Sequence, residues 1–195
     1  MAIYTRSGDQ GMTRLYGGHS VSKASERVGT YGAIDQLNAS VGYLAALVDP
    51  KYDQVQSQLL AIQQDLFDCG SDYATLDQER PYKVKSGLAD KLEAWIDDYT
   101  EATPSIKKFV LPRGTQAASF CHMLRTQTRT LERQLVQFSQ VSQDYNPQVL
   151  PYINRLSDYF FSLARALNHY ENYREVPYKN SRNIFSQASP ETKES

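Results

Sequence analysis

The residues that most clearly suggest chemistry are three arginines spaced four positions apart, Arg125, Arg129 and Arg133, with Glu132 among them. In a helix, at roughly 100° per residue, these four side chains project within about a quarter of a turn of one another. Guanidinium groups stay charged and bind phosphate oxygens in pairs, so such a row suits a polyphosphate. A solvated charged face is the commoner explanation of such a row, and the arginines alone do not decide between the two.

A second polar row, Asn154, Asp158 and Arg165, also lies beside an apolar stripe. Two helices that each carry a polar row next to an apolar stripe favour a polar cleft between them. The glycine-rich segment 5–18 fits a phosphate ligand as well, because glycines and hydroxyls let backbone N–H groups approach phosphates closely. This segment is not a P-loop, since no G-x-x-x-x-G-K-[ST] occurs, and the chain has no G-x-G-x-x-G after a strand.

Apolar residues recur at steps of three and four, which predicts helices. The five segments are 34–48, 55–67, 86–99, 124–138 and 153–167. Pro50, Asn146-Pro147 and Pro177 interrupt the pattern, and no segment alternates convincingly with period two. We therefore expect an all-α, up-and-down five-helix bundle. It forms a single domain over residues 1–175, with an N-terminal binding loop at 1–20, an extended connection at 109–114 and a polar tail at 176–195.

Composition excludes several classes of protein. The net charge of −1 argues against nucleic acid or an anionic membrane surface as a partner. No apolar run approaches the roughly 20 residues that span a bilayer, and Met1–Asp9 lacks the apolar stretch of a signal peptide. Cys69 and Cys121 lie in expected helices and are expected to be free thiols in a reducing cytoplasm.

A five-helix pattern is also found in two other kinds of helical bundle. A di-iron bundle needs Glu-x-x-His pairs, and none of His19, His122 and His169 has a glutamate three positions before it. A structural or adaptor bundle without catalysis is equally compatible with the composition. Binding of ATP to the purified protein is a first test of the adaptor alternative.

Specific stretches resemble the PduO-type ATP:cob(I)alamin adenosyltransferase family up to about Asn168. The four main stretches are residues 5–11 (TRSGDQG), 31–38 (YGAIDQLN), 125–133 (RTQTRTLER) and 154–161 (NRLSDYFF), with 62–70 (IQQDLFDCG) as a supporting match. The resemblance implies transfer of the 5′-deoxyadenosyl group from ATP to cob(I)alamin, with Mg²⁺ held mainly through the ATP phosphates. It further implies a homotrimer of five-helix bundles with active sites between subunits, and a cobalamin reductase as a partner.

The resemblance also assigns roles to individual residues. The residues that would bind ATP are Thr5, Arg6, Ser7, Gly8, Thr13, Arg14, Lys23, Arg129, Glu132, Arg133 and Asn154. Arg129 is similar to the arginine essential for transfer, and Asp35 and Arg125 to a pair that forms a salt bridge between subunits. Phe109 is similar to the aromatic residue below the corrin ring, although its apolar neighbours Val110 and Leu111 would by themselves indicate a core residue. Phe185 is expected to be a second apolar residue near cobalamin.

The sequence departs from the family pattern at several positions. Gln36 stands where a glutamate is usual, Thr130 and Gln134 where further arginines are common, and Pro112-Arg113-Gly114-Thr115 replaces a P-G-G-S turn. These changes spare the residues assigned to chemistry. They bear on the finer network around the phosphates and on the affinity for ATP.

Overall fold

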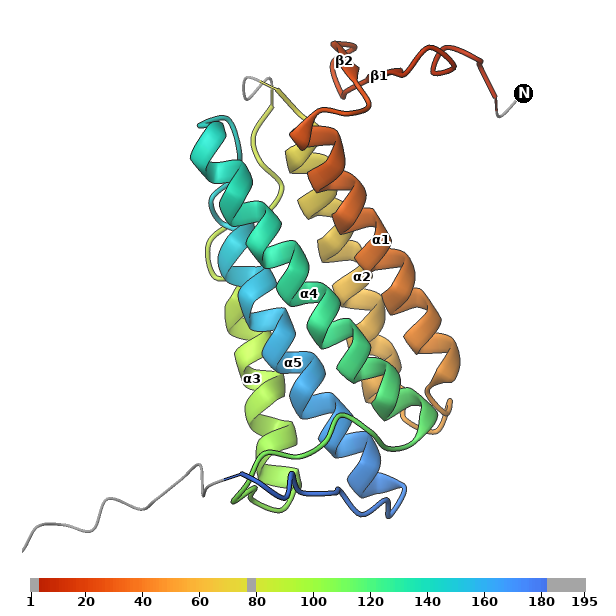
Figure 1. The fold of residues 1–195 in the computed structure, drawn as a ribbon, viewed down its shortest axis with the longest axis vertical. Helices are drawn as coiled ribbons and strands as arrows, with labels where there is room; N and C mark the ends of the chain where they lie inside the picture. Colours follow the sequence, from red (N-terminus) through yellow and green to blue (C-terminus); the bar gives the residue numbers. More distant parts are fainter. Residues whose placement is uncertain (1–3, 77–79, 182–195) are drawn as a thin grey trace, which may run out of the picture.

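Five α-helices make up most of the protein in this computed structural model, which describes residues 4–76 and 80–181. They are α1 (Glu26–Leu47), α2 (Asp53–Tyr73), α3 (Leu88–Ala102), α4 (Gln116–Val141) and α5 (Val149–Tyr170). Successive helices run in opposite directions, so the predicted up-and-down bundle is confirmed (Figure 1). We call the end of the bundle at which α1 begins the upper end, and we call the end at which α5 finishes the lower end.

Local sequence signals explain where the helices begin and end. The Ser25 hydroxyl accepts a hydrogen bond from the backbone N–H of Val28 at the start of α1, and Thr115 caps Ala118 in the same way at the start of α4. A capping hydroxyl satisfies one of the backbone donors that lack a partner in the first turn. Pro50 follows α1 and Asn146-Pro147 separates α4 from α5, as predicted.

The core is centred on α5, which packs against both α3 and α4, while α1 packs against α2 and α4. Tyr159 of α5 is fully buried, and its hydroxyl donates a 3.0 Å hydrogen bond to the side-chain oxygen of Gln58 on α2. The hydroxyl of Tyr99 on α3 donates to the same oxygen. This amide therefore joins three helices in the interior. Cys69 and Cys121 are both buried and free, as predicted.

The expectation that the chain contains no strand was wrong. Strands β1 (Met12–Arg14) and β2 (Ser20–Ser22) form an antiparallel hairpin, with Thr13 opposite Val21. Each strand has three residues, which is too short for a period of two to be visible in the sequence. Gly17 and Gly18 both have positive φ values in the turn, a conformation that glycine adopts without strain.

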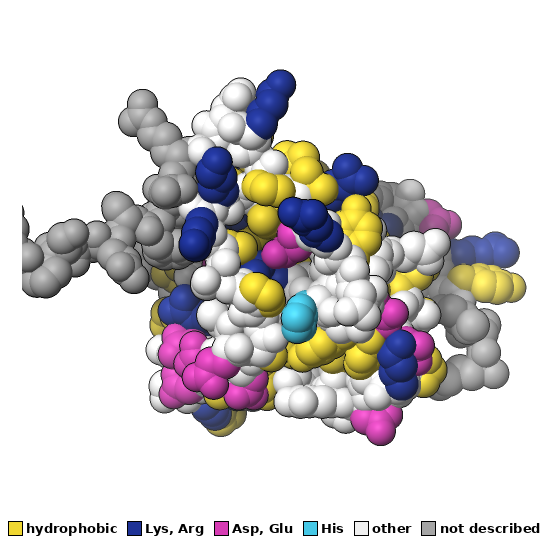
Figure 2. Space-filling view, turned by 90° about the horizontal axis from the view of Figure 1, so that it is seen from below, with side chains coloured by type: hydrophobic (Ala, Val, Ile, Leu, Met, Phe, Trp, Pro, Cys, Tyr) yellow, Lys and Arg dark blue, Asp and Glu magenta, His cyan; other side chains and the backbone are white. Residues whose placement is uncertain are grey.

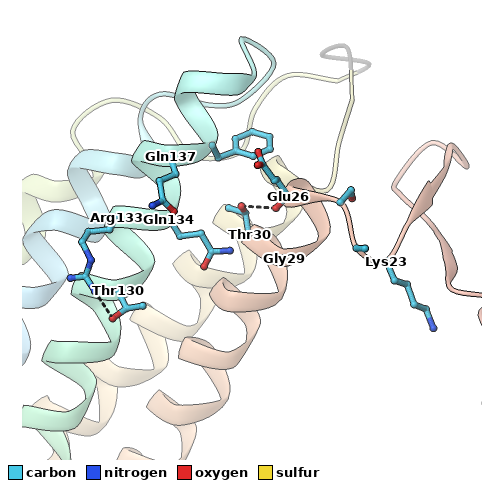
Figure 3. Close-up of a pocket in the computed structure, with 11 residues that line it drawn as sticks. Lys23, Glu26, Gly29, Thr30, Thr130, Arg133, Gln134 and Gln137 are labelled. Carbon is cyan, nitrogen blue, oxygen red and sulfur yellow. Dashed lines mark hydrogen bonds between the residues drawn. The ribbon is translucent and has the colours of Figure 1, made fainter.

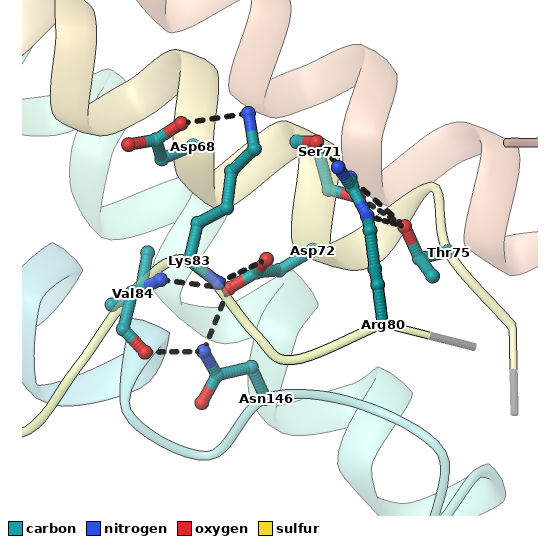
Figure 4. Close-up of polar contacts among 8 residues, drawn as sticks. All are labelled: Asp68, Ser71, Asp72, Thr75, Arg80, Lys83, Val84 and Asn146. Carbon is teal, nitrogen blue, oxygen red and sulfur yellow. Dashed lines mark hydrogen bonds and ion pairs between the residues drawn. The ribbon is translucent and has the colours of Figure 1, made fainter. Parts of the chain in front are cut away.

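A polar network seats this hairpin on the upper end of the bundle (Figure 4). The buried carboxylate of Asp72, at the end of α2, accepts hydrogen bonds from the backbone N–H groups of Lys83 and Val84 and from the side chain of Asn146. Arg80 lies in the connection between α2 and α3. It donates a hydrogen bond to Thr75 just after α2, and its guanidinium lies 4.0 Å from the Tyr16 ring centroid. The loop between β1 and β2 therefore rests on an ordered platform.

A second small pairing closes the lower end. Leu111 N–H donates to Val176 O at 2.9 Å, Tyr178 N–H donates to Phe109 O at 2.7 Å, and Val110 pairs with Pro177 as an antiparallel bridge. Residues 109–111 and 176–178 are called the lower ribbon below. It joins the extended connection before α4 to the segment that follows α5. No helix in the described part of the chain is both long and apolar enough to cross a bilayer.

Candidate active site

The seven residues of the N-terminal half that were predicted to bind ATP come together in one structural unit, the loop and hairpin ahead of α1. Lys23 connects its two ends, because its Nζ donates to Gly8 O at 2.9 Å and its backbone N–H donates to Gly11 O at 2.8 Å. The hydroxyls of Thr5 and Ser7 lie 2.8 Å apart and are hydrogen bonded. Most of these side chains are exposed, so their hydroxyl and cationic groups are available to a ligand.

Arg6 is the most unusual residue of this loop. Its φ of 59° lies in the left-handed region, which a residue with a side chain seldom adopts. The arginine is exposed, and its guanidinium lies over the Tyr4 ring at 5.7 Å from the centroid. Residues held in such backbone conformations cluster at active sites and in loops that bind ligands. The conformation is consistent with a loop shaped to bind a ligand.

A cavity of about 420 Å³ lies between the start of α1 and the upper half of α4 (Figure 3). Its lining includes Lys23 and Glu26 from the α1 side, and Thr130, Arg133 and Gln134 from α4. Figure 3 shows the Lys23 side chain pointing away from α4 toward the hairpin. Two residues predicted to bind ATP, Lys23 and Arg133, therefore line one cavity, and their cationic groups point to different parts of its rim.

Several cavity residues were not predicted, although a signal for them existed. Thr30 and Gln137 also line the cavity. Gln137 follows Arg133 by four positions, so it lies on the same face of α4, and Thr30 follows Glu26 by four on α1. The spacing of the arginines alone does not single out these neutral side chains, which contribute amide and hydroxyl groups to the lining.

The polar rows of α4 and α5 meet at one point. Asn154 Nδ2 donates to Glu132 Oε1 at 2.5 Å, so the two helices share a polar surface there, and the cleft expected between them stays a prediction. Arg129 is exposed one turn before Glu132. The remainder of the α5 row diverges, since Asp158 is exposed and pairs with Arg155.

Arg165 does not belong to this polar surface, so the predicted row on α5 was wrong in its last member. Its side chain is buried, at 7% relative exposure, and forms an ion pair with Glu175 at 3.2 Å near the lower end. Arg165 follows Asp158 by seven positions, which places it two helical turns further along α5. Spacing alone could not show that the row enters the interior at that point.

Burial and charge change the chemistry of the lower part of the α4 row. His122 is 4% exposed, and its pKa is lowered to about 4, first by burial and then by the nearby Arg125 cation. The pKa of Arg125 is itself lowered, by burial and then by Arg129. Arg125 Nε is buried without a hydrogen-bond partner among the described residues. This face of α4 is therefore cationic and partly desolvated, and a carboxylate or phosphate would be attracted to it.

The chain does not bring Asp35 and Arg125 together. Asp35 is exposed on α1 and lines a groove of about 310 Å³ between α1 and α2, along with Tyr31, Leu66 and Phe67. Arg125 lies on α4, and among the described residues the two form no ion pair with each other. Both lie on surfaces that a second molecule can reach.

Phe109 is exposed, at 63%, in the lower ribbon, so the core explanation of its apolar neighbourhood was wrong. Leu111 is also exposed. Hydrophobic side chains lie among basic ones at this lower end of the bundle, and most of the acidic side chains lie toward the edges of the view (Figure 2). An exposed apolar ring on an ordered ribbon indicates a contact surface. Phe185, the second residue predicted to contact cobalamin, lies outside the described residues.

Known proteins resemble this chain over most of its length. A family model described as cobalamin adenosyltransferase matches residues 3–167. A corrinoid adenosyltransferase of Bacillus subtilis (strain 168) is 42% identical over 187 residues, covering 95% of this chain and 96% of that protein. One from Mycobacterium bovis is 38% identical over 175 residues, covering 85% and 88% respectively.

Solved structures agree as well. A phenylalanine-to-histidine variant of a PduO-type ATP:corrinoid adenosyltransferase from Lactobacillus reuteri, complexed with cobalamin and ATP, superimposes with a TM-score of 0.89 at 44% identity. The match covers 94% of this chain and 100% of that one. An arginine-to-lysine variant complexed with ATP has a TM-score of 0.85 at the same identity, covering 91% of this chain and 100% of that one.

Proposed function

The chain belongs to the cobalamin adenosyltransferase family, and we propose that it transfers the 5′-deoxyadenosyl group of ATP to the cobalt of cob(I)alamin, releasing triphosphate. The observation that carries the proposal is the family match over residues 3–167, which includes both the N-terminal loop and the arginine row of α4. Relatives that cover almost the whole chain are named as corrinoid adenosyltransferases. The protein is an enzyme of this class.

We assign the nucleotide to two surfaces. The loop and hairpin ahead of α1 would bind the triphosphate and ribose through Thr5, Arg6, Ser7, Gly8, Thr13, Arg14 and Lys23. The face of α4 and α5 that holds Arg129, Glu132, Arg133 and Asn154 would complete the site. Support comes from the hydrogen bond by which Lys23 Nζ joins the segment just before α1 to Gly8 of the loop, and from the hydrogen bond between Glu132 and Asn154.

Arg129 and Phe109 receive additional support from the solved relatives. In the Lactobacillus reuteri enzyme, the phenylalanine and the arginine that were substituted lie 20 positions apart. Phe109 and Arg129 are separated by the same number of positions here. We propose that Phe109 lies below the corrin ring and that Arg129 contacts the phosphates. Phe185 stays a proposal on the resemblance alone.

The arrangement of these residues favours an active site shared between two copies of the chain. Phe109 lies at the lower end, just before α4 begins, whereas Arg133 lines the cavity near the upper end. At 1.5 Å per residue, the start of α4 and Arg133 are about 25 Å apart. That separation makes one chain an unsuitable platform for both substrates. We propose a homotrimer in which Asp35 of one subunit pairs with Arg125 of the next.

The proposed reaction is a nucleophilic displacement. The cobalt of cob(I)alamin donates an electron pair to C5′ of ATP and a Co–C bond forms. The C5′–O bond breaks, and its electron pair leaves with the triphosphate. Cobalamin carries the nucleophile, so this chain's residues supply position and charge. Arg129 and Lys23 would hold the polyanionic leaving group and stabilise the charge that develops on it.

Phe109 would serve the preceding reduction. Reducing cob(II)alamin is easier once the lower axial ligand has left cobalt, and an apolar ring at that face would exclude both the displaced base and water. Its exposure on the lower ribbon leaves the ring free for that contact. A reductase partner would supply the electron. We propose a cytoplasmic location for the enzyme, supported by the free thiols of Cys69 and Cys121.

Mg²⁺ would enter with ATP. Among the described residues, no group of three His, Cys, Asp or Glu side chains could hold a metal ion. Mg²⁺ commonly binds through one or two carboxylates together with substrate phosphates and water. Glu26 and Glu132 each offer one carboxylate beside the proposed phosphate path, and either would suit such an ion. Bound there, the ion would neutralise part of the phosphate charge.

The decisive experiment is an anaerobic assay with ATP, Mg²⁺ and chemically reduced cobalamin, monitored by the spectrum of adenosylcobalamin. We expect product formation that depends on both ATP and Mg²⁺. A well-folded protein that binds ATP and cobalamin but forms no adenosylcobalamin with several reductants would support the non-catalytic adaptor instead.

A further inference from the structure

Beside the lower ribbon lies an ion pair that the proposed reaction does not use, between the buried Arg165 and the half-buried Glu175. Arg165 of α5 directs its guanidinium toward two chain segments that flank the ribbon. Its Nε donates to both carboxylate oxygens of Glu175 at 3.2 Å. Its Nη1 donates to Thr103 Oγ1 at 3.2 Å and its Nη2 donates to Pro104 O at 2.5 Å. One side chain therefore links α5, the connection after α3 and the segment after α5.

Glu175 is adjacent in sequence to the lower ribbon. It immediately precedes Val176, whose carbonyl accepts the hydrogen bond from Leu111 N–H. Tyr178 N–H then donates to Phe109 O. Fixing Glu175 thus sets the start of the strand that pairs with Phe109.

Apart from the ribbon itself, Phe109 has one further hydrogen bond, from its backbone N–H to Ser181 Oγ at 3.1 Å. Its ring is largely exposed, so core packing does not set its position. The backbone of residues 109–111 is held on one side by the 176–178 segment. On the other side it continues toward Arg113, whose carbonyl accepts a hydrogen bond from Asn168 of α5. The position of the ring is therefore decided by backbone contacts that begin at α5.

We propose that Arg165, acting through Glu175, is a positioning residue for Phe109. The ion pair keeps the lower ribbon closed, and the closed ribbon presents the Phe109 ring to the lower face of cobalamin. The inference rests on the proposed function, because it takes Phe109 as the corrin-facing residue. Arg165 itself touches neither substrate.

The contacts of Arg165 identify Glu175→Gln as the most informative variant. Removing the arginine would leave Thr103 and Pro104 without their donor in the interior, which risks general destabilisation. Glu175→Gln keeps the shape of the side chain and removes only the charge, while Arg165 keeps its bonds to Thr103 and Pro104. We therefore expect a folded protein whose ribbon opens more often.

Glu171→Gln is the matched control. Glu171 lies four positions before Glu175 and also makes an ion pair, with Lys51 at 2.8 Å, but it is exposed and does not contact the ribbon. The chemical change is identical in both variants. A difference between them therefore reports the position of Glu175 and not the loss of a carboxylate near the end of α5.

Hydrogen exchange of the full-length protein tests the structural half of the proposal without any assay of activity. The N–H groups of Leu111 and Tyr178 are the ribbon's donors. We expect both to exchange at least about fivefold faster in Glu175→Gln than in wild type, because a charge-assisted contact has been lost. Glu171→Gln should match wild type. Unchanged exchange at both amides in Glu175→Gln would overturn the proposal.

Two enzyme assays test the functional half. With cob(I)alamin formed in advance, no lower ligand has to be displaced, so Glu175→Gln should retain activity within about twofold of wild type. From cob(II)alamin with a mild reductant, we expect a loss of about fivefold or more, following the opening of the ribbon. An equal loss in both assays, or no loss in either, would overturn the positioning role.

The same measurements separate failure of this inference from failure of the proposed function. If wild type forms no adenosylcobalamin, the proposed function fails, whatever the exchange data show. A second outcome is that wild type is active and Phe109→Ala loses activity only in the cob(II)alamin assay, while Glu175→Gln loses activity in neither assay. Phe109 would then keep its role in cobalamin use, and Arg165 would not be a positioning residue.

Discussion

Asn154 on α5 donates a 2.5 Å hydrogen bond to Glu132 on α4, and this contact joins the polar surfaces of two helices. Both residues are at the bundle surface, and Arg129 lies one turn from Glu132. The amide therefore orients a carboxylate beside the arginine proposed to hold the phosphates. The contact gives a direct way to test the nucleotide side of the proposed site.

Asn154→Asp should weaken ATP binding. It places a second carboxylate against Glu132, and the repulsion would displace both side chains from the phosphate path. We expect the KM for ATP to rise about tenfold, corresponding to ~1.4 kcal/mol. Combining Asn154→Asp with Glu132→Gln restores a donor and an acceptor and should recover part of the loss. A KM for ATP that is unchanged in the single variant would remove this pair from the nucleotide site.

Arg129→Ala should lower turnover by about 10²-fold or more, as expected when a contact to the charge of the transition state is lost. The matched control is Arg155→Ala, because Arg155 is a partly exposed arginine on α5 that pairs with Glu93 and Asp158 outside the proposed site. Steady-state rates with preformed cob(I)alamin measure both variants. Near-normal turnover in Arg129→Ala would end its assignment as a catalytic residue.

Asp35→Asn should impair the association of subunits or the use of cobalamin, because Arg125 would lose its partner from the next chain. Within one chain the two residues form no ion pair, so the variant should leave the stability of an isolated chain almost unchanged. Size-exclusion chromatography with light scattering gives the oligomeric state. The exchange of charges in Asp35→Arg with Arg125→Asp should restore part of what either single change removes. A double variant no better than the singles would argue against direct pairing.

Phe109→Ala should harm the assay that starts from cob(II)alamin far more than the assay with preformed cob(I)alamin. Since the ring is exposed, the change should cost little stability and leave the Tm close to that of wild type. Phe160→Ala provides the contrast, because Phe160 is fully buried and its truncation should cost about 3–5 kcal/mol. Equal losses in the two assays for Phe109→Ala, together with a lowered Tm, would return Phe109 to a structural role.

His122 should make the free energy of unfolding depend on pH. Its pKa is lowered to about 4 in the folded protein from an ordinary value of 6.5, so the unfolded chain binds the proton more readily. Stability contributed by the neutral histidine is present above pH 6.5 and is lost as the pH falls toward 4. Between pH 7 and pH 5 the loss should reach up to about 2 kcal/mol.

Denaturant titrations of wild type and His122→Asn at both pH values measure this contribution. The difference between pH 7 and pH 5 should be smaller in the variant. His169→Asn, at an exposed histidine near the end of α5, should retain the wild-type dependence. Equal pH dependence in wild type and His122→Asn would show that burial does not perturb this histidine.

The sequence was sufficient for the helices and for the family. Apolar steps of three and four, such as Ile34, Leu37 and Val41, predict a buried stripe because each position is set by the geometry of its own helix. Stretches such as Arg125 to Arg133 identify the family, because residues that act together on one helix face stay close in the chain. Pro50 and Pro147 likewise predict where helices are interrupted, because proline lacks the backbone N–H that a helix interior requires.

The tertiary structure decided the remainder, because it depends on contacts between distant segments. Arg165 looked like a member of a polar row, but its environment is set by Thr103 and Glu175, which only packing brings to it. Phe109 stands in an apolar run and is nevertheless exposed, since pairing with residues 176–178 holds it at the surface. Sequence spacing determines which residues share a face of a helix, whereas burial of that face depends on what packs against it.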